Sequence, residues 1–211
     1  MCFYQGVGAF VRYIFCDPWT LFWKWASGKL ISREIVNALY GAIRLVKFDV
    51  AGRGYFNYTV EGFWRSFVAA ILAFPIFLAL TFVHVWSFEG PIFQEVQLVV
   101  LRYATGWLVY PLVVLVLVKV LNRTANYVAY IITINWLAVP QWALACAVGA
   151  LGHATGPDIG NLLAVFLLML LVYYDFFVTR IVLNLTTGRA AMVVLIGMLV
   201  AMVLDITILG T

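Results

Sequence analysis

Five long runs of apolar residues constrain this chain more than any other feature. Each run is close to the roughly 20 residues that a helix needs to cross a bilayer. Only short connectors separate the runs, so no water-soluble domain fits between them. They cover residues 66–87, 98–121, 126–151, 161–184 and 190–210.

The composition points to the same class of protein. Hydrophobic residues make up 65% of the 211 residues and charged residues only 10%, against about 25% charged residues in an ordinary soluble domain. A domain of this length has too little interior to hide that much apolar surface from water. The chain is too hydrophobic to be disordered, and its unbroken runs differ from the alternating strands of an outer-membrane barrel.

The sequence therefore predicts an all-α integral membrane protein, with five transmembrane helices preceded by an interfacial amphipathic helix. Small residues four apart, such as Ala69 and Ala73, favour close packing of these helices. We divide the chain into an aromatic-rich interfacial segment (1–32), an amphipathic helix with a Gly-rich connector (33–65) and the five-helix bundle (66–211).

The segment 1–32 has two interpretations. Its many aromatic residues favour the headgroup level of a membrane. Alternatively, the gene start is overlong, and residues 1–31 do not belong to the native product. Because no Met lies between Met1 and Met169, a shorter product would need a non-Met start codon near Leu30 or Val36.

Residues 33–48 have the pattern of an amphipathic helix. At about 100° per residue, Arg33, Arg44 and Lys47 share one face and aliphatic residues occupy the other. This pattern predicts a helix lying in the cytoplasmic interface, with these three residues as candidate contacts to lipid. Packing of the same helix on its own bundle is an alternative that is compatible with the first. Residues 49–65 are then expected to form a Gly-rich loop.

Basic residues set the expected orientation. If the N-terminus is cytoplasmic, all Lys and Arg residues except Arg102 fall on the cytoplasmic side. The sequence therefore predicts a multi-pass protein of the bacterial cytoplasmic (inner) membrane, with its N-terminus in the cytoplasm and its C-terminus outside. The net charge is +4, but no Lys/Arg run of the kind that follows phosphates is present, so we expect no nucleic-acid partner.

Two groups of polar residues lie inside the predicted spans, where ionisable side chains are costly. Asp175 and Asn135 lie at similar mid-depth and would form a polar binding or proton site, or else hydrogen bonds that hold helices together. His84, Arg102 and Asp205 lie near the outer ends of three spans. There an Arg102–Asp205 pair would neutralise both charges, and structural pairing is the favoured interpretation.

Enzyme signatures are scarce. The chain has neither an HExxH nor a GxSxG motif. His153 with Asp158 offers too few ligands for zinc, which needs three or four. We therefore expect no catalytic residues, no metal site and no cofactor.

The layout resembles the Yip-type membrane domain, which has a cytoplasmic N-terminal region, five closely spaced helices and very short connectors. Two stretches are similar to bacterial members: GFWRSFVAAILAFPIFLAL (62–80) and LNLTTGRAAMVVLIGMLV (183–200). The resemblance covers about residues 35–211. Eukaryotic members carry an acidic-Leu-Tyr-Gly-Pro motif, whereas Ala38-Leu39-Tyr40-Gly41 lacks the acid and the Pro. The resemblance therefore assigns no site residue. It implies membrane organisation or trafficking, often through small GTPases in eukaryotes, and the chain is also similar to small uncharacterised bacterial inner-membrane proteins.

The expected function is that of a non-enzymatic inner-membrane scaffold or interaction protein. Its partners would be the lipid bilayer and other membrane proteins or a second copy in a homodimer. The alternative is a small transporter or channel subunit with Asp175 and Asn135 as its midplane polar site. A membrane-embedded enzyme is a third and less favoured class.

Overall fold

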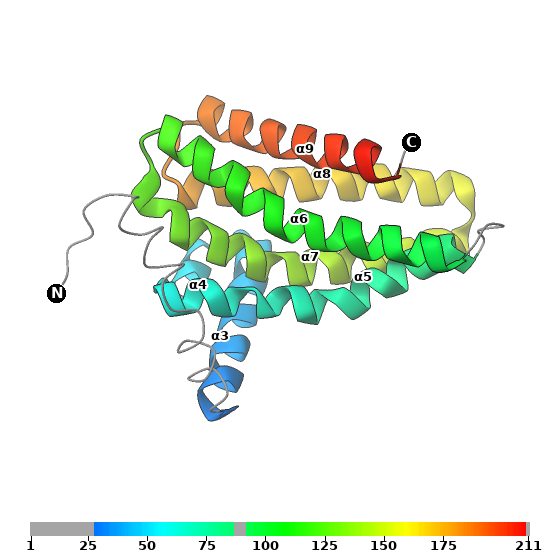
Figure 1. Ribbon diagram of the computed structural model, residues 1–211, viewed down its shortest axis with the longest axis horizontal. Coiled ribbons are helices and arrows are strands. Elements are labelled where there is room, and N and C mark those ends of the chain that lie inside the picture. The colour runs from blue at the N-terminus through cyan, green and yellow to red at the C-terminus, as the bar shows by residue number, and fades with distance from the viewer. Residues whose placement is uncertain (1–27, 87–91, 210–211) are drawn as a thin grey trace.

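The computed structural model describes residues 28–86 and 92–209, and the part described is built from helices and turns (Figure 1). The predicted aromatic segment 1–32 lies almost entirely outside it. The helices are α3 (Gly28–Val46), α4 (Val60–Ser66), α5 (Val68–Trp86), α6 (Ile92–Val120), α7 (Tyr127–Thr155), α8 (Pro157–Val182) and α9 (Thr187–Leu209), with 3-10 turns η1 (Val50–Tyr55) and η2 (Thr124–Asn126).

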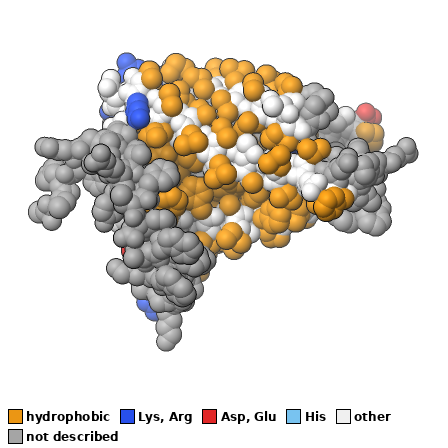
Figure 2. Space-filling model, viewed as in Figure 1, with side chains coloured by type: hydrophobic (Ala, Val, Ile, Leu, Met, Phe, Trp, Pro, Cys, Tyr) orange, Lys and Arg blue, Asp and Glu red, His pale blue; other side chains and the backbone are white. Residues whose placement is uncertain are grey.

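Five helical stretches within the described ranges are long and apolar enough to cross a membrane. They confirm the five helices predicted from the apolar runs. Their flanks are covered by hydrophobic side chains, and Lys and Arg gather at one end of the visible face (Figure 2). These features fit a multi-pass membrane protein. The five stretches are Val60–Thr81, Val96–Val120, Thr124–Thr155, Pro157–Val182 and Thr187–Ile208.

Helix α7 occupies the centre of the bundle. It packs against α3, α4, α5 and α8, whereas α9 packs on α6 and α8. Its first half holds several of the largest fully buried side chains, including Tyr130, Ile131 and Leu137. Ala69 and Ala73, the small pair expected to allow close packing, are both 0% exposed. A helix whose hydrophobic residues are spread over all of its faces, as in α7, belongs in such a position.

The connector 49–65 is more regular than its glycines predict. Asp49 caps η1, because its carboxylate accepts a hydrogen bond from the backbone N–H of Ala51 at 2.9 Å. Thr59 caps α4 in the same way, accepting from the N–H of Gly62 at 3.0 Å. The loop prediction was wrong for these two stretches because capping side chains satisfy N–H groups that would otherwise be left unpaired.

The C-terminal end of α3 has an unusual residue. Phe48 has φ 61°, a left-handed conformation that costs an ordinary residue about 1–2 kcal/mol. Asn122 and Asn184, which follow α6 and α8, adopt the same conformation with φ 54° and 51°, but Asn tolerates it well. The Phe48 ring packs on Tyr174 and Phe177 of α8, with centroid distances of 4.9 and 5.3 Å. These ring contacts offset the backbone strain and hold the end of α3 against α8.

Candidate functional site

Helix α3 lies steeply across the long helices, near the end of the bundle that holds the α6–α7 and α8–α9 connectors (Figure 1). It packs on η1 and α7 through one face. Ala38, Ala42 and Leu45 on this face are at most 1% exposed. The positions repeat at the three- and four-residue spacing of a helical stripe.

Two glycines bring α3 and η1 into contact. A Cβ added at Gly41 would lie 2.8 Å from the carbonyl oxygen of Gly52. A Cβ added at Gly52 would lie 2.6 Å from the carbonyl oxygen of Gly41. Backbone meets backbone here, so neither position has room for a side chain.

Charged side chains also hold α3 and η1 to neighbouring parts of the chain. The Glu34 carboxylate accepts hydrogen bonds from Arg65 Nη1 at 2.6 Å and from Asn57 Nδ2 at 3.0 Å. Arg53 Nη1 donates to the carbonyl oxygen of Ile181 at 3.0 Å, which ties η1 to α8. The amphipathic helix is therefore held by both apolar packing and polar bonds.

Arg44 adds a further bond between α3 and η1. Its guanidinium pairs with Asp49 and donates to the Tyr55 hydroxyl at 3.0 Å. The bond from Arg44 and the backbone N–H of Ala51 lower the pKa of Asp49, and the same ion pair raises the pKa of Arg44. Arg44 therefore has internal partners, because η1 folds back beside it, and its contact with lipid stays a prediction.

The opposite side of α3 is left open. Val36 is 64% exposed, Tyr40 50% and Ile43 48%. Arg33 and Lys47, the other two predicted interface residues, are exposed on the same side. The helix thus packs on its own bundle and also presents an apolar ridge flanked by basic residues, so the two interpretations of this helix are compatible. We call Val36, Tyr40 and Ile43 the α3 ridge.

The predicted midplane residues have different partners. Asp175 on α8 accepts a hydrogen bond from Gln141 Nε2 on α7 at 3.0 Å. Asn135 on α7 donates from Nδ2 to Ser66 Oγ at 2.8 Å. The expected bond between Asp175 and Asn135 is therefore replaced by two separate interhelical bonds. Sequence reasoning missed Gln141, although a Gln directly after Pro140 in an apolar run was a signal for it.

Other polar side chains of α7 also bridge neighbours. The Tyr130 hydroxyl lies 2.8 Å from the Tyr110 hydroxyl of α6 and 2.9 Å from Thr179 Oγ1 of α8. Thr133 Oγ1 lies 3.3 Å from the Tyr58 hydroxyl. Each bond joins α7 to a different element, as expected of polar groups that hold membrane helices together.

At the other end of the bundle, the predicted pair of Arg102 and Asp205 is confirmed. Arg102 Nε donates to Asp205 Oδ1 at 2.6 Å, and Nη2 donates to Oδ2 at 2.9 Å. This bidentate geometry joins α6 to α9. The side chain of His84, the third member of the predicted cluster, lies outside the described residues.

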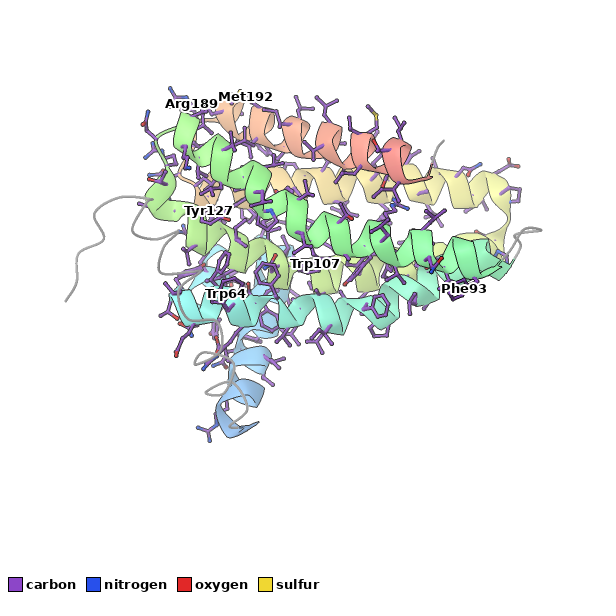
Figure 3. All side chains as sticks on the ribbon, in the orientation of Figure 1. Trp64, Phe93, Trp107, Tyr127, Arg189 and Met192 are labelled. Carbon is purple, nitrogen blue, oxygen red and sulfur yellow. The ribbon has the colours of Figure 1, made fainter. Side chains whose placement is uncertain are left out.

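A cavity of about 310 Å³ lies between α5, α6, α7 and α9. The Arg102–Asp205 pair borders one end of it, and Asn135 and Tyr110 border the deeper part. Trp107 of α6, labelled in Figure 3, is one of the aromatic residues in its largely apolar walls. The other aromatic wall residues are Phe77, Tyr103, Tyr110 and Trp142.

No metal centre is formed by the side chains that the structure describes, because nowhere among them do three His, Cys, Asp or Glu residues gather. Comparison with known proteins finds no matching family model, no matching curated protein and no matching solved structure. The resemblance to the Yip-type domain thus stays a prediction, and the function has to be inferred from the geometry.

Proposed function

We propose that this chain is a non-enzymatic scaffold or interaction protein of the bacterial inner membrane, and that α3 is its docking surface. The observation that carries the proposal is that α3 is fixed on the bundle by specific contacts while the α3 ridge is exposed. The Gly41–Gly52 contact and the Glu34–Arg65 pair hold α3 on the bundle. The α3 ridge remains exposed although it contains two aliphatic side chains and a tyrosine.

A helix that is already ordered before binding loses less conformational entropy when a partner binds. A free amphipathic helix must be ordered when it binds a partner, and the ordering entropy is subtracted from its affinity. Here the protein's own contacts have already ordered α3. Exposed apolar residues rimmed by polar ones are typical of protein or membrane interaction sites.

The charge distribution supports an orientation with α3 in the cytoplasm and the C-terminus outside. Lys119, Arg180 and Arg189 are exposed at the end of the bundle where α3 lies. Asp158 is exposed at the opposite end. Basic residues favour the cytoplasmic side of a membrane, where they also attract anionic lipid.

The polar residues inside the bundle are better suited to structure than to catalysis. Asn135, Thr133, Tyr130 and Asp175 each bond to a neighbouring element. Catalysis needs polar groups that converge on one reacting centre. Bonds that diverge from α7 to several neighbours instead support a stable frame for a binding surface.

Photo-crosslinking in native membranes tests this proposal. A benzophenone amino acid is placed at Val36 or Ile43, and at Leu199 of α9 as the matched control, since Leu199 is 56% exposed but distant in sequence from α3. We expect a discrete protein adduct from the two α3 positions and only lipid adducts from Leu199. An adduct of twice the chain mass would identify a second copy as the partner. Lipid adducts alone at all three positions would contradict the proposal.

A small transporter or channel subunit is the second candidate function, and the cavity beside α7 is the observation that favours it. The test is Asn135→Ala, because Asn135 lines this cavity whereas Asp175 does not, and it is measured as ion flux in proteoliposomes and as stability in the same preparation. Loss of flux with unchanged stability supports the transporter. Lower stability without a specific loss of flux supports the scaffold.

A further inference from the structure

We propose that the cavity between α5, α6, α7 and α9 binds one hydrocarbon chain of a membrane amphiphile, with an anionic oxygen of its headgroup held by Arg102. The phosphate of a phospholipid and the carboxylate of a fatty acid share this chemistry. The site is independent of the α3 ridge and lies toward the opposite end of the bundle.

The shape of the cavity fits a hydrocarbon chain. Its wall on α6 extends from Arg102 to Pro111, and its wall on α9 extends from Gly197 to Asp205. At 1.5 Å per residue, these segments are about 12–14 Å long. The volume of about 310 Å³ therefore belongs to an elongated cavity. An elongated, largely apolar cavity of this length suits an extended hydrocarbon chain.

The length of the cavity is close to the thickness of one leaflet, and because the cavity begins inside the ends of the spans it reaches the middle of the bundle. Half of the roughly 30 Å hydrocarbon core is about 15 Å, close to the length of the cavity. Asp205 lies three residues before the end of its span at Ile208, and Arg102 lies six residues after the start of its span at Val96. The ion pair is therefore about 5–9 Å inside the ends of these spans. From there the cavity runs toward the middle of the bundle.

The ion pair leaves hydrogen-bonding capacity for a headgroup. A guanidinium has five N–H donors, and Asp205 uses one on Nε and one on Nη2. The remaining donors can bind an anionic oxygen without displacing Asp205. The side chains of Arg102 and Asp205 are 41% and 38% exposed, and the lining residues Gly106 and Ala201 are also exposed. A lipid therefore has access to this end.

Asn135 gives the deep part of the cavity a polar floor. Ser66 Oγ donates its own proton to the carbonyl oxygen of Phe63 at 2.7 Å. The Ser66 hydroxyl can therefore only accept a hydrogen bond from Asn135, so Asn135 Nδ2 must face Ser66. The amide oxygen of Asn135 is then the polar atom that remains for the cavity. An apolar chain does not gain by covering an amide oxygen. Asn135 should therefore limit how far the chain penetrates.

Fluorescence quenching tests the proposal, because Trp107 and Trp142 line the cavity. The full chain is reconstituted in phosphatidylcholine nanodiscs that contain increasing fractions of phosphatidylglycerol brominated in its acyl chains. Bromine quenches tryptophan on contact. We expect a saturable component of quenching at a mole fraction about tenfold below the gradual quenching by bulk lipid, since a charge-assisted hydrogen bond is worth about that factor.

Filling the cavity should remove the saturable component. Gly106→Phe is the first variant, because a Cβ at this position meets nothing within 4 Å. Ala138→Phe, deeper in the cavity, is the second. Ala104→Phe is the matched control, since Ala104 is an exposed residue of the same helix as Gly106 and does not line the cavity. Thermal unfolding in the same nanodiscs checks that each variant folds. The proposal is overturned if the wild type has no saturable component, or if both filled variants keep it.

Two further probes, brominated stearic acid and brominated diacylglycerol, define the ligand. Saturation by brominated phosphatidylglycerol alone identifies a membrane phospholipid, and saturation by brominated stearic acid alone identifies a free fatty acid. Equal saturation by uncharged brominated diacylglycerol would refute the role of Arg102.

The double variant Arg102→Gln, Asp205→Asn should lose the preference for an anionic headgroup. Asn135→Leu should shift the preferred chain to a greater length, and an unchanged preference would refute the polar floor.

Discussion

Replacing Gly52 by alanine should loosen α3 from the bundle. The added Cβ would lie 2.6 Å from the carbonyl oxygen of Gly41, 3.0 Å from Arg44 Cβ and 3.1 Å from the backbone N of Leu45. These atoms belong to the backbone or its first side-chain carbon, so rotation of a side chain cannot relieve the clash. The first distance is about 0.8 Å short of an ordinary contact, which begins at 3.4 Å, so the two segments must separate.

The expected cost is about 1–3 kcal/mol, the usual range for forcing an extra carbon into a tight site. Alanine at a position with an ordinary backbone conformation also gains about 0.4–1 kcal/mol by restricting the unfolded chain. The predicted net effect is therefore a loss of stability of up to about 2.5 kcal/mol. Equilibrium unfolding in mixed detergent micelles measures it.

Gly54→Ala is the matched control in the same turn, because a Cβ at Gly54 meets nothing within 4 Å. It should be neutral or stabilising by up to about 1 kcal/mol. Gly41→Ala should destabilise as Gly52→Ala does, and the double variant should cost less than the two single variants together, since the first change already separates the backbones. A Gly52→Ala protein as stable as Gly54→Ala would refute the close contact.

Three other predictions concern single residues or pairs. Asp205→Asn should destabilise the protein by about 1 kcal/mol more than it does in an Arg102→Gln background, and additive unfolding energies would show that the pair is not coupled. Phe48→Ala should be about 1 kcal/mol less stable than Phe48→Gly, because both lose the ring contacts but only alanine keeps the left-handed strain. A stability equal to that of Phe48→Gly would contradict this. The hydrogen bond from Arg44 is the main reason that the pKa of Asp49 lies below its ordinary 3.8. Ionised Asp49 should therefore stabilise the folded protein above about pH 4, and this stabilisation should be lost as the pH falls through the lower pKa of the folded state. The free energy of unfolding measured from pH 3 to pH 7 should show this loss at the acid end, and the Asp49→Asn variant should depend less on pH.

The helical bundle and the Arg102–Asp205 ion pair were predictable from the sequence. Backbone polar groups in lipid must be satisfied within the helix, so a run of about 20 apolar residues already implies a spanning helix. Arg102 and Asp205 have opposite charges near the same ends of their spans, and few other charges lie at that depth. A pairing of the two was therefore the simplest way to neutralise both.

The partners of Asp175 and Asn135 were not predictable in the same way. Depth along a helix follows from residue number, but the direction of a side chain depends on how neighbouring helices are rotated about their axes. Helix packing sets that rotation, and as a result Asp175 bonds to Gln141 and Asn135 bonds to Ser66. Similar depth was therefore insufficient evidence for a direct hydrogen bond between the two residues.

The sequence by itself determined that this chain folds into apolar helices, where they begin and end to within a few residues, and which end of the bundle is basic. These properties depend on local hydrophobicity and on charge counted along the chain. Only the tertiary structure decided that two glycines seat α3 against η1, that Phe48 packs on α8 and that four helices enclose a cavity. Such features arise between elements distant in sequence, where the shapes of packed side chains, and not any local pattern, fix the distance between two backbones.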